Sequence, residues 1–372
     1  MKKLFILAAA AVVAIAACSK NEADTTAYEQ SRVINFNTVA NKATKVPISG
    51  TTFASTNDPF GVFAYYLAEG NWNTAGANAS AVSYMNDVEV AFDDTKDIWA
   101  PTSTYYWPLE GKLTFIAYWP KAAATAAFSN AGVLTLTGFT VNTTVASQVD
   151  LLYSSIAADK TQNESYYVDG TNSKNSETAE GDKGVNIKFK HALSQVIFKA
   201  KTADEVYDAG LSFKVNSITV NAASTATSMT VTNPTDAQLA ENITTWTDPG
   251  TNVNFAASSA AFPAAANTYL TKTLSDPIGD PLLMIPVTAF AGTDPTVTIN
   301  YTLYRLSDNQ GLGSKEVTIH FDDVDDVITN WQAGKKYVYN LTIDLQKIYF
   351  NPTITDWVDG GSQDVDVPDD AS

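Results

Sequence analysis

Apolar and polar residues alternate along most of this chain with the period of β-strands rather than of helices. Near the N-terminus, Ile34, Phe36 and Thr38 share one face of a short predicted strand whose other face carries asparagines. The aromatic run 59–67 does not alternate and predicts a central strand that is buried on both faces. About a dozen such segments at regular spacing, with few helical patterns, predict β-sandwiches or barrels.

A polar loop follows the first predicted strand and carries Lys42 and Lys45 beside proline and glycine. These residue types favour exposed turns, so we expect the loop to lie on the surface and to be open to proteases. Further along, the aromatic segments 98–107 and 113–119 flank a Pro-Leu-Glu-Gly turn and predict a hairpin.

The composition of the chain changes at 159–184, where aliphatic residues almost disappear. This change predicts two domains, 33–184 and 185–372, and the length of 372 residues favours the same division. The second domain opens with alternating apolar residues at Val185 and Ile187. The apolar phase then shifts, and we expect a β-bulge near 194–195 to explain the shift.

The C-terminal region has the clearest alternation in the sequence, over 337–345, and Trp357 closes it. The apolar positions that alternate beyond 345 are Ile348, Phe350, Ile354, Val365 and Val367. The first three continue a strand, whereas the last two lie among aspartates and are compatible with a strand or with a solvated end.

Residues 1–17 combine a basic start, an apolar run and small residues before Cys18, an arrangement that resembles a bacterial lipobox. We expect a lipoprotein signal peptide over 1–17, lipidation of Cys18 and a flexible polar tether over 18–32, so that acyl chains anchor the chain to a membrane. A plain secretory signal followed by an incidental cysteine is the alternative. Because the chain has no second cysteine, no intramolecular disulfide can form.

The net charge of −17 repels phosphate backbones, so nucleic acids are not expected partners. His191 lies in phase with buried positions and predicts a hydrogen-bonded core histidine, whereas His320 is expected on a solvent face. The acidic run 322–326 could attract calcium, but it lacks the glycine and glutamate of an EF-hand loop, and a solvated turn is the stronger interpretation. No catalytic, metal or cofactor site is predicted, and an enzyme is not expected.

Aromatic residues make up 11% of the chain, and exposed ones can bind glycans. Most of them lie in predicted strands, where core packing is the usual role. Trp72 lies in a loop rich in glycine and asparagine and is the aromatic residue that we expect to face outward. It supports one functional hypothesis, a monomeric surface lipoprotein that binds glycans through aromatic loop residues.

Several short motifs occur along the chain in a defined order. They are YWP at 106–108, LTFIAYWP at 113–120, DLL at 150–152, FKHALS at 189–194, WQAGKKY at 331–337 and ITDW at 354–357. Together with the lipobox, this series resembles the fimbrillin family, the type V pilins of Bacteroidales.

The resemblance implies two transthyretin-like β-sandwich domains in tandem and export to the outer membrane as a lipoprotein. It also implies maturation by a trypsin-like protease that cuts behind the first strand. On this sequence the cut falls after Lys45, with Lys42 as the second choice. The removable strand is 33–38, with Ile34 and Phe36 as the side chains that plug a groove.

The resemblance further implies that a strand from another subunit fills the emptied groove. We expect this donor in the C-terminal region, either at 347–357 or at Val365 and Val367. The chain would then be a structural subunit of a cell-surface fimbrium, with other fimbrial subunits as partners in a homopolymer or heteropolymer. Its biological use would be adhesion to glycans or proteins on host or bacterial surfaces, and stalk, anchor and tip roles stay open.

Overall fold

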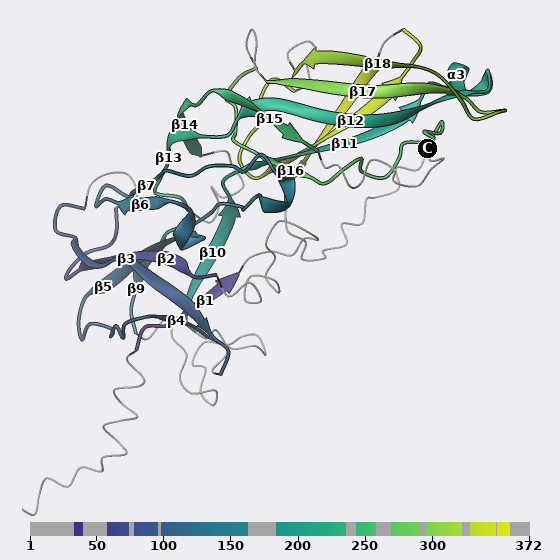
Figure 1. Cartoon of the computed structure of the whole chain (residues 1–372). Helices are drawn as coiled ribbons and strands as arrows, with labels where there is room; N and C mark the ends of the chain where they lie inside the picture. Colours follow the sequence, from purple (N-terminus) through teal and green to yellow (C-terminus); the bar gives the residue numbers. More distant parts are fainter. Residues whose placement is uncertain are drawn as a thin grey trace, which may run out of the picture.

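The computed structural model describes residues 33–39, 58–73, 78–95, 98–162, 184–235, 243–257, 269–290, 295–321, 328–346 and 348–357. Cys18, Lys42, Lys45, Val365, Val367 and the acidic run 322–326 lie outside these residues. The described chain is elongated, with a domain at each end and a smaller sheet between them (Figure 1).

Nearly all of the regular structure is β-strand, as the abundance of β-branched and aromatic residues predicts. The strands are β1 (Phe36–Val39), β2 (Phe60–Leu67), β3 (Val82–Asp93), β4 (Ile98–Pro101), β5 (Lys112–Trp119), β6 (Thr125–Phe128), β7 (Val133–Thr137), β8 (Leu152–Ser154), β9 (Ala157–Lys160), β10 (Val185–His191), β11 (Ser194–Thr202), β12 (Leu211–Ala223), β13 (Ala226–Thr232), β14 (Thr244–Pro249), β15 (Asn252–Ala256), β16 (Leu282–Met284), β17 (Thr296–Arg305), β18 (Gln310–His320), β19 (Lys335–Ile343) and β20 (Ile348–Asp356). Two 3-10 turns, η2 (Lys121–Ala123) and η3 (Val145–Ser147), and the short helix α3 (Asp204–Asp208) complete the described elements. The prediction of an all-β chain with tandem β-sandwich domains is confirmed.

The N-terminal domain is a sheet that closes on itself. Its strands follow the order β2-β3-β4-β1-β10-β8-β5-β9, and a further pairing of β2 with β5 completes the ring. The ring encloses a core of aromatic and aliphatic side chains that includes Phe36, Trp99 and Phe115. Because a closed ring has no free edge, removing one of its strands exposes two edges at once.

Strand β2 is buried on both faces, which confirms the prediction for 59–67. Phe60 and Val62 face the core of the closed sheet, whereas Phe63 and Leu67 face the larger core that continues into the rest of the molecule. Its neighbour β5 is divided in the same way between the two cores. Because both faces of such a strand pack against apolar side chains, neither face carries polar residues, which explains the continuous apolar run.

The predicted hairpin between 98–107 and 113–119 is wrong. β4 pairs with β3 and β1, whereas β5 pairs with β2, β8 and β9. Between the two strands, Trp107 is buried in the core of the closed sheet. The connecting segment therefore crosses the end of the sheet instead of folding back as a tight turn.

The shift in apolar phase between β10 and β11 marks the passage from one domain to the next. β10 pairs with β1 and β8 of the N-terminal domain, whereas β11 pairs with β16 and β19 of the C-terminal domain. The chain bends at 192–193 between them. The predicted bulge is therefore a change of sheet, and the predicted boundary at 184–185 falls before a strand that belongs to the first domain.

A sheet of order β14-β13-β7-β6 lies between the domains. In it β7, from the first half of the chain, pairs with β13, from the second half, and Leu136 lies opposite Met229. Both side chains belong to the core that also fills the C-terminal domain. The two halves of the chain are therefore joined by a shared sheet as well as by the covalent chain.

The C-terminal domain is a sandwich of two four-stranded sheets, β16-β11-β19-β20 and β15-β12-β17-β18. Aromatic rings pack between the sheets, with Phe321 and Tyr339 4.9 Å apart between ring centroids. The Trp331 Nε1–H donates to the Tyr339 hydroxyl at 2.9 Å within this core. In this arrangement β20 is an edge strand with one neighbour, β19.

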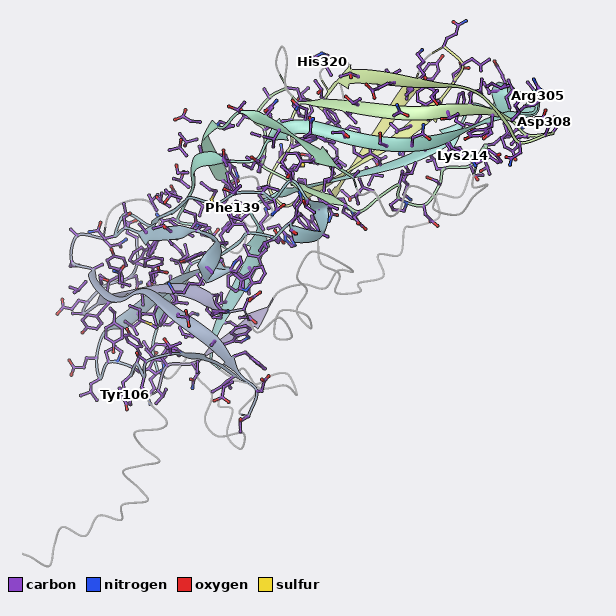
Figure 2. The ribbon with its side chains drawn as sticks, viewed as in Figure 1. Tyr106, Phe139, Lys214, Arg305, Asp308 and His320 are labelled. Carbon is purple, nitrogen blue, oxygen red and sulfur yellow. The ribbon has the colours of Figure 1, made fainter. Side chains whose placement is uncertain are left out.

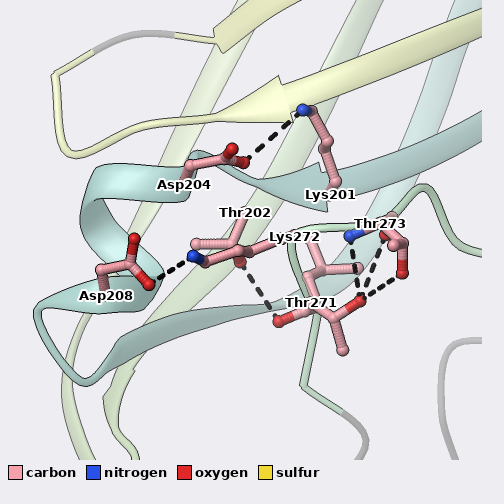
Figure 3. A network of polar contacts seen from close by, with 8 residues as sticks. Lys201, Thr202, Asp204, Asp208, Thr271, Lys272 and Thr273 are labelled. Carbon is pink, nitrogen blue, oxygen red and sulfur yellow. Dashed lines mark hydrogen bonds and ion pairs between the residues drawn. The ribbon is translucent and has the colours of Figure 1, made fainter.

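The far end of the C-terminal domain carries α3 and the end of β19. The backbone N–H of Ala203 donates to the carbonyl of Ile343 at 2.9 Å and so holds these elements together. An ion pair between Lys272 and Asp208 lies at the same end (Figure 3). Surface ion pairs of this kind contribute about 0–1 kcal/mol each to the free energy of unfolding, so this pair adds little to the stability of this end.

Within the described residues, no helix is long and apolar enough to cross a bilayer. The same residues contain no cluster of three or more His, Cys, Asp or Glu side chains that could hold a metal ion.

Candidate functional site: the slot that holds the first strand

Strand β1 occupies a position between β4 and β10 that we call the first-strand slot. On one side β1 runs parallel to β10, with Phe36 opposite Val185 and Thr38 opposite Ile187. On the other side it is antiparallel to β4, with Phe36 opposite Trp99. β1 therefore closes the ring of the N-terminal domain, although it is among the shortest strands in it.

Main-chain groups hold the beginning of the strand in the slot. The N–H of Ile34 donates to the carbonyl of Tyr105 at 2.8 Å, and the N–H of Val185 donates to the carbonyl of Asn35 at 2.9 Å. A bridge between Val33 and Tyr106 continues this pairing at the entrance. These bonds use only backbone atoms, so a strand with a different sequence can make them as well.

The two predicted plugs are fully buried. Ile34 and Phe36 are each 0% exposed, which confirms the side of the strand that the alternation assigned to the core. The Phe36 ring meets Phe60 and Phe115 edge to face, with centroids 5.9 and 5.6 Å apart. Edge-to-face packing of this kind adds about 0.5–1.5 kcal/mol per pair to the burial itself.

The walls of the slot are aromatic. The Phe60 ring contacts Trp99 from β4 at 5.2 Å and Phe189 from β10 at 5.6 Å. Trp107 packs against Phe115 at 5.8 Å deeper in the same core. The walls are therefore supported by one another as well as by Phe36, so they can keep their shape when the plug changes.

Gly184 allows the slot to hold a strand so closely. Its φ of +139° belongs to a region that favours glycine. A Cβ at this position would lie 2.4 Å from the carbonyl oxygen of Asn35. A larger residue here would therefore push the first strand away from the start of β10.

The entrance of the slot is apolar and exposed. Tyr106 is 46% exposed and Leu109 is 78% exposed, whereas Trp107 between them is buried at 1%. The Tyr84 hydroxyl donates to the Tyr106 carbonyl and fixes this segment to β3. Figure 2 places Tyr106 at the free end of the N-terminal domain, away from the C-terminal domain.

Strand β20 carries three of the predicted donor positions. It pairs with β19 along its whole length, from Ile348 opposite Ile343 to Asp356 opposite Lys335. Three of its apolar side chains are only partly buried: Tyr349 is 46% exposed, Ile354 is 45% exposed, and Ile348 is partly buried against the larger core. Val365 and Val367, the other predicted donor positions, lie outside the described residues.

Trp357 anchors the end of β20 at the junction of the two domains. Its indole stacks on the ring of His191, with centroids 3.7 Å apart and planes within 3° of parallel. His191 Nδ1 in turn hydrogen-bonds a carboxylate oxygen of Asp150. His191 is therefore the hydrogen-bonded core histidine that the sequence predicts, whereas His320 is partly exposed.

Trp72 does not face outward as expected from its loop. It is 5% exposed, its Nε1–H donates to Asn233 Oδ1 at 3.0 Å, and its ring stacks on Phe128 at 6.0 Å. The glycine and asparagine around it shape a turn that carries the indole inward, which residue composition alone does not reveal. The candidate glycan contact is therefore a core residue.

Two tyrosines that pack in the larger core, Tyr118 and Tyr153, keep their hydroxyl protons. Burial, together with a hydrogen bond to Asp87, raises the pKa of the Tyr118 hydroxyl, and burial raises the pKa of the Tyr153 hydroxyl. Neither group provides a base or a nucleophile at neutral pH. What the slot offers is main-chain hydrogen-bonding groups and apolar walls, which suit the binding of an extended strand.

Sequence reasoning missed the walls and the entrance. Trp99 on β4 and Val185 on β10 lie far apart in the sequence, but both pair with β1 in the closed sheet. Gly184 ends the polar stretch 159–184. A glycine directly before a strand was the available sequence signal that another backbone segment approaches closely there. Leu109 lies in the expected turn and Tyr106 in the strand expected over 98–107, and the pattern did not show that both are exposed while Trp107 between them is buried.

A model of the fimbrillin-like family matches residues 43–357 of this chain. The chain belongs to the fimbrillin-like family. The match begins after β1 and ends at Trp357, so it covers the strands that flank the slot and β20 of this fimbrillin-like protein.

A curated relative and two solved structures are similar to this chain. The chain is 25% identical over 403 residues to the fimbrium subunit Fim1C of Phocaeicola vulgatus, covering 97% of this chain and 98% of that protein. A crystal structure of a fimbrial protein from Bacteroides vulgatus matches with a TM-score of 0.59 and 21% identity, covering 88% of this chain and 100% of that one. A cell adhesion protein from Bacteroides uniformis, described as putative, matches with a TM-score of 0.48 and 14% identity, covering 88% of this chain and 99% of that one.

The family model and the curated relative thus place this fimbrillin-like protein with fimbrial subunits. The structure of the fimbrial protein from Bacteroides vulgatus supports the fold.

Proposed function

We propose that this protein is a structural subunit of a cell-surface fimbrium that polymerises by exchanging β1 for a strand of a neighbouring subunit. The observation that carries the proposal is the position of β1. It is short, its plugs Ile34 and Phe36 are fully buried, and it closes an otherwise complete ring between β4 and β10. A replaceable strand needs this combination of a preformed slot and a small insert.

Maturation starts with a cut after Lys45, or after Lys42 as the second choice. Both lysines lie in 40–57, which joins β1 to β2 in the sequence. Burial of an isoleucine or phenylalanine side chain is worth about 1.5–3 kcal/mol, so two plugs hold the strand only moderately once the covalent link is lost. The cut turns an intramolecular strand into a fragment that dilution removes.

Export precedes this step. The signal peptide over 1–17 and lipidation of Cys18 deliver the precursor to the outer membrane as a lipoprotein, and 18–32 tethers it there. A cut behind the first strand also separates the folded body from this anchor. One cleavage therefore both frees the slot and releases the subunit for assembly on the cell surface, where the fimbrium supports adhesion.

The donor is β20. Ile348-Tyr349-Phe350-Asn351 repeats the I-x-F-N pattern of Ile34-Asn35-Phe36-Asn37, so it offers the same two plugs at the same spacing. As an edge strand β20 has one neighbour, whereas the slot provides two, so exchange would add main-chain hydrogen bonds along its free edge. The alternation at Val365 and Val367 has the same period, but its side chains are smaller.

Limited trypsin digestion of the intact protein tests the proposal. We expect removal of the segment up to Lys45, followed by oligomers that survive in SDS without boiling. Combined Lys42→Gln and Lys45→Gln substitutions should abolish both effects, whereas Lys315→Gln on exposed β18 should change neither. Clipped protein that loses β1 and stays monomeric at high concentration would overturn strand exchange.

The alternative of a glycan-binding monomer loses its supporting residue, because Trp72 is buried against Phe128 and Asn233.

A further inference from the structure

The entrance of the first-strand slot carries an exposed apolar patch, made of the side chains of Tyr106 and Leu109, that the exchange of strands does not itself explain. Tyr106 is 46% exposed and Leu109 is 78% exposed. Buried Trp107 between them and the Tyr84 hydroxyl bond to the Tyr106 carbonyl hold the segment in place. Exposed apolar side chains on a rigid segment are a frequent mark of a contact surface.

The direction of β1 fixes which end of a bound strand lies at this patch. β1 runs parallel to β10, and Val33, just before it, pairs with Tyr106. The strand therefore enters at the patch and points toward the C-terminal domain (Figure 1). A donor that takes the place of β1 in the same direction has its N-terminal end at the patch.

The N-terminal end of β20 is attached to the far end of its own subunit. β19 ends at Ile343, beside α3, and β20 begins at Ile348. The linker 344–347 can separate Ile343 from Ile348 by at most about 18 Å when fully extended. If β20 of one subunit lies in the slot of the next, the far end of the first subunit must therefore lie within about 18 Å of the entrance of the second.

The far end offers a matching apolar group. Leu345, in the linker, is 50% exposed. The charged side chains around it are largely satisfied within their own subunit, as in the ion pairs of Lys201 with Asp204 and of Lys272 with Asp208 (Figure 3). Figure 2 shows Arg305 and Asp308, which also pair with each other, at the end of the molecule opposite Tyr106.

We propose that Tyr106 and Leu109 form a docking surface for a second copy of this chain, whose far end around Leu345 is brought there by the exchanged β20. This inference rests on the proposed strand exchange. It adds a contact between subunit bodies that orients each subunit on the next and makes the polymer stiffer than a chain of bodies joined by strands alone.

Charge substitutions at the patch test the inference. Leu109→Glu and Tyr106→Glu alter side chains only, so the main-chain bonds of Tyr106 to the first strand remain. After trypsin cleavage, clipped monomers should still bind a synthetic peptide of residues 348–357 with wild-type affinity, because the peptide brings no body with it. Assembly of whole subunits should slow at least tenfold.

Two further variants sharpen the test. Leu312→Glu, at a 41% exposed leucine on β18, should leave assembly unchanged. Leu345→Glu alone and Leu109→Lys alone should each slow assembly. The double variant Leu109→Lys with Leu345→Glu should assemble faster than either single variant, because the new charges attract across the contact.

Assembly of Leu109→Glu at the wild-type rate, with the peptide bound normally, would overturn the docking surface and leave strand exchange intact. A wild-type protein that binds no peptide and forms no oligomers after clipping would instead overturn the exchange, and the docking surface with it.

Discussion

At the scale of residues, the behaviour of the N-terminal domain depends on how two side chains and one glycine fit the first strand to its slot. Phe36 fills a space between Phe60 and Phe115, and Gly184 permits the close approach of Asn35. These contacts must be strong enough to keep the precursor closed and weak enough to be replaced after cleavage. Substitutions at either position should shift that balance.

Phe36→Ala should weaken the binding of β1 in the first-strand slot. Loss of a buried phenylalanine costs about 3–5 kcal/mol, so the intact protein should melt at a lower temperature and the clipped fragment should leave faster. The mature polymer should keep its wild-type stability, because β1 is no longer part of it. Phe128→Ala, in the other core, is the matched control: it should lower the stability of precursor and polymer alike.

Gly184→Ala should also loosen the first strand, because the added Cβ would meet the Asn35 carbonyl. Gly138 is a suitable control, since its φ of +76° is also positive and unfavourable for alanine, but nothing lies within 4 Å of a Cβ there. The strain at such a φ costs about 1–3 kcal/mol at either position. Release of the clipped fragment should be faster in Gly184→Ala than in Gly138→Ala, and equal rates would contradict the steric argument.

At the scale of elements, the proposed donor role of β20 opposes the role that β20 has in the monomer. In the monomer it completes the sheet beside β19, with Trp357 stacked on His191 at the junction of the domains. As a donor it must give up both contacts. The anchor at Trp357 therefore sets part of the barrier to assembly.

Trp357→Ala should speed assembly of clipped subunits, because β20 loses the contact that holds its C-terminal end. The rate can be followed by light scattering at fixed protein concentration. Trp246→Ala, which removes a buried indole from β14 without touching β20, should give no acceleration. Unchanged or slower assembly of Trp357→Ala would favour the tail beyond Trp357 as the donor.

The strands themselves were largely predictable from local alternation, and their partners were not. The alternation correctly placed Ile34 and Phe36 on a buried face, and the aromatic run of β2 between two cores. It gave the wrong partner for 98–107, because β4 pairs with β3, which comes just before it in the sequence, and with the distant β1 across the closed sheet. It also could not show that the phase shift after His191 is a change of sheet, since a bulge produces the same pattern.

The candidate site was predictable in part for the same reason. Its insert is a local pattern, whereas its walls are assembled from Trp99, Phe115 and Val185, which only the fold brings together. Trp72 was misplaced because loop composition says nothing about the direction of a single side chain. The roles of Ile34 and Phe36 as removable plugs, and of Lys45 as the cleavage site, stay predictions.

At the scale of the whole molecule, buried tyrosines make stability depend on alkaline pH. Burial raises the pKa of Tyr337 to about 12 and also raises the pKa values of Tyr118, Tyr153 and Tyr339. Folding therefore favours the protonated hydroxyls. This stability is fully present below the ordinary tyrosine pKa of about 10 and is lost as the pH rises through the folded values.

The melting temperature should accordingly stay nearly level to about pH 10 and fall between about pH 10 and 12. Tyr337→Phe should reduce the fall, because one ionisable group is removed from the core. Tyr106→Phe, at an exposed tyrosine, is the control and should leave the profile unchanged. A level profile to pH 12 would contradict the burial of these hydroxyls.

The polymer expected from the proposed strand exchange is a row of elongated subunits, each closed by the edge strand of its neighbour. The register is specific: if Phe350 replaces Phe36, Asn351 takes the place of Asn37, which lies opposite Asn186 on β10. Cysteines at facing positions of paired strands lie within the distance that a disulfide requires.

The most direct test is therefore a disulfide between subunits. In a Cys18→Ser background, protein with Asn186→Cys and Asn351→Cys should stay monomeric when intact and, after clipping and mild oxidation, form a covalent ladder on non-reducing gels that collapses on reduction. Oligomers that assemble after clipping without such a ladder, while Asn186→Cys paired with Pro368→Cys gives one, would contradict β20 as donor, because Pro368 takes the place of Asn37 when Val367 replaces Phe36. No ladder with either pair would contradict occupation of the slot by a neighbour.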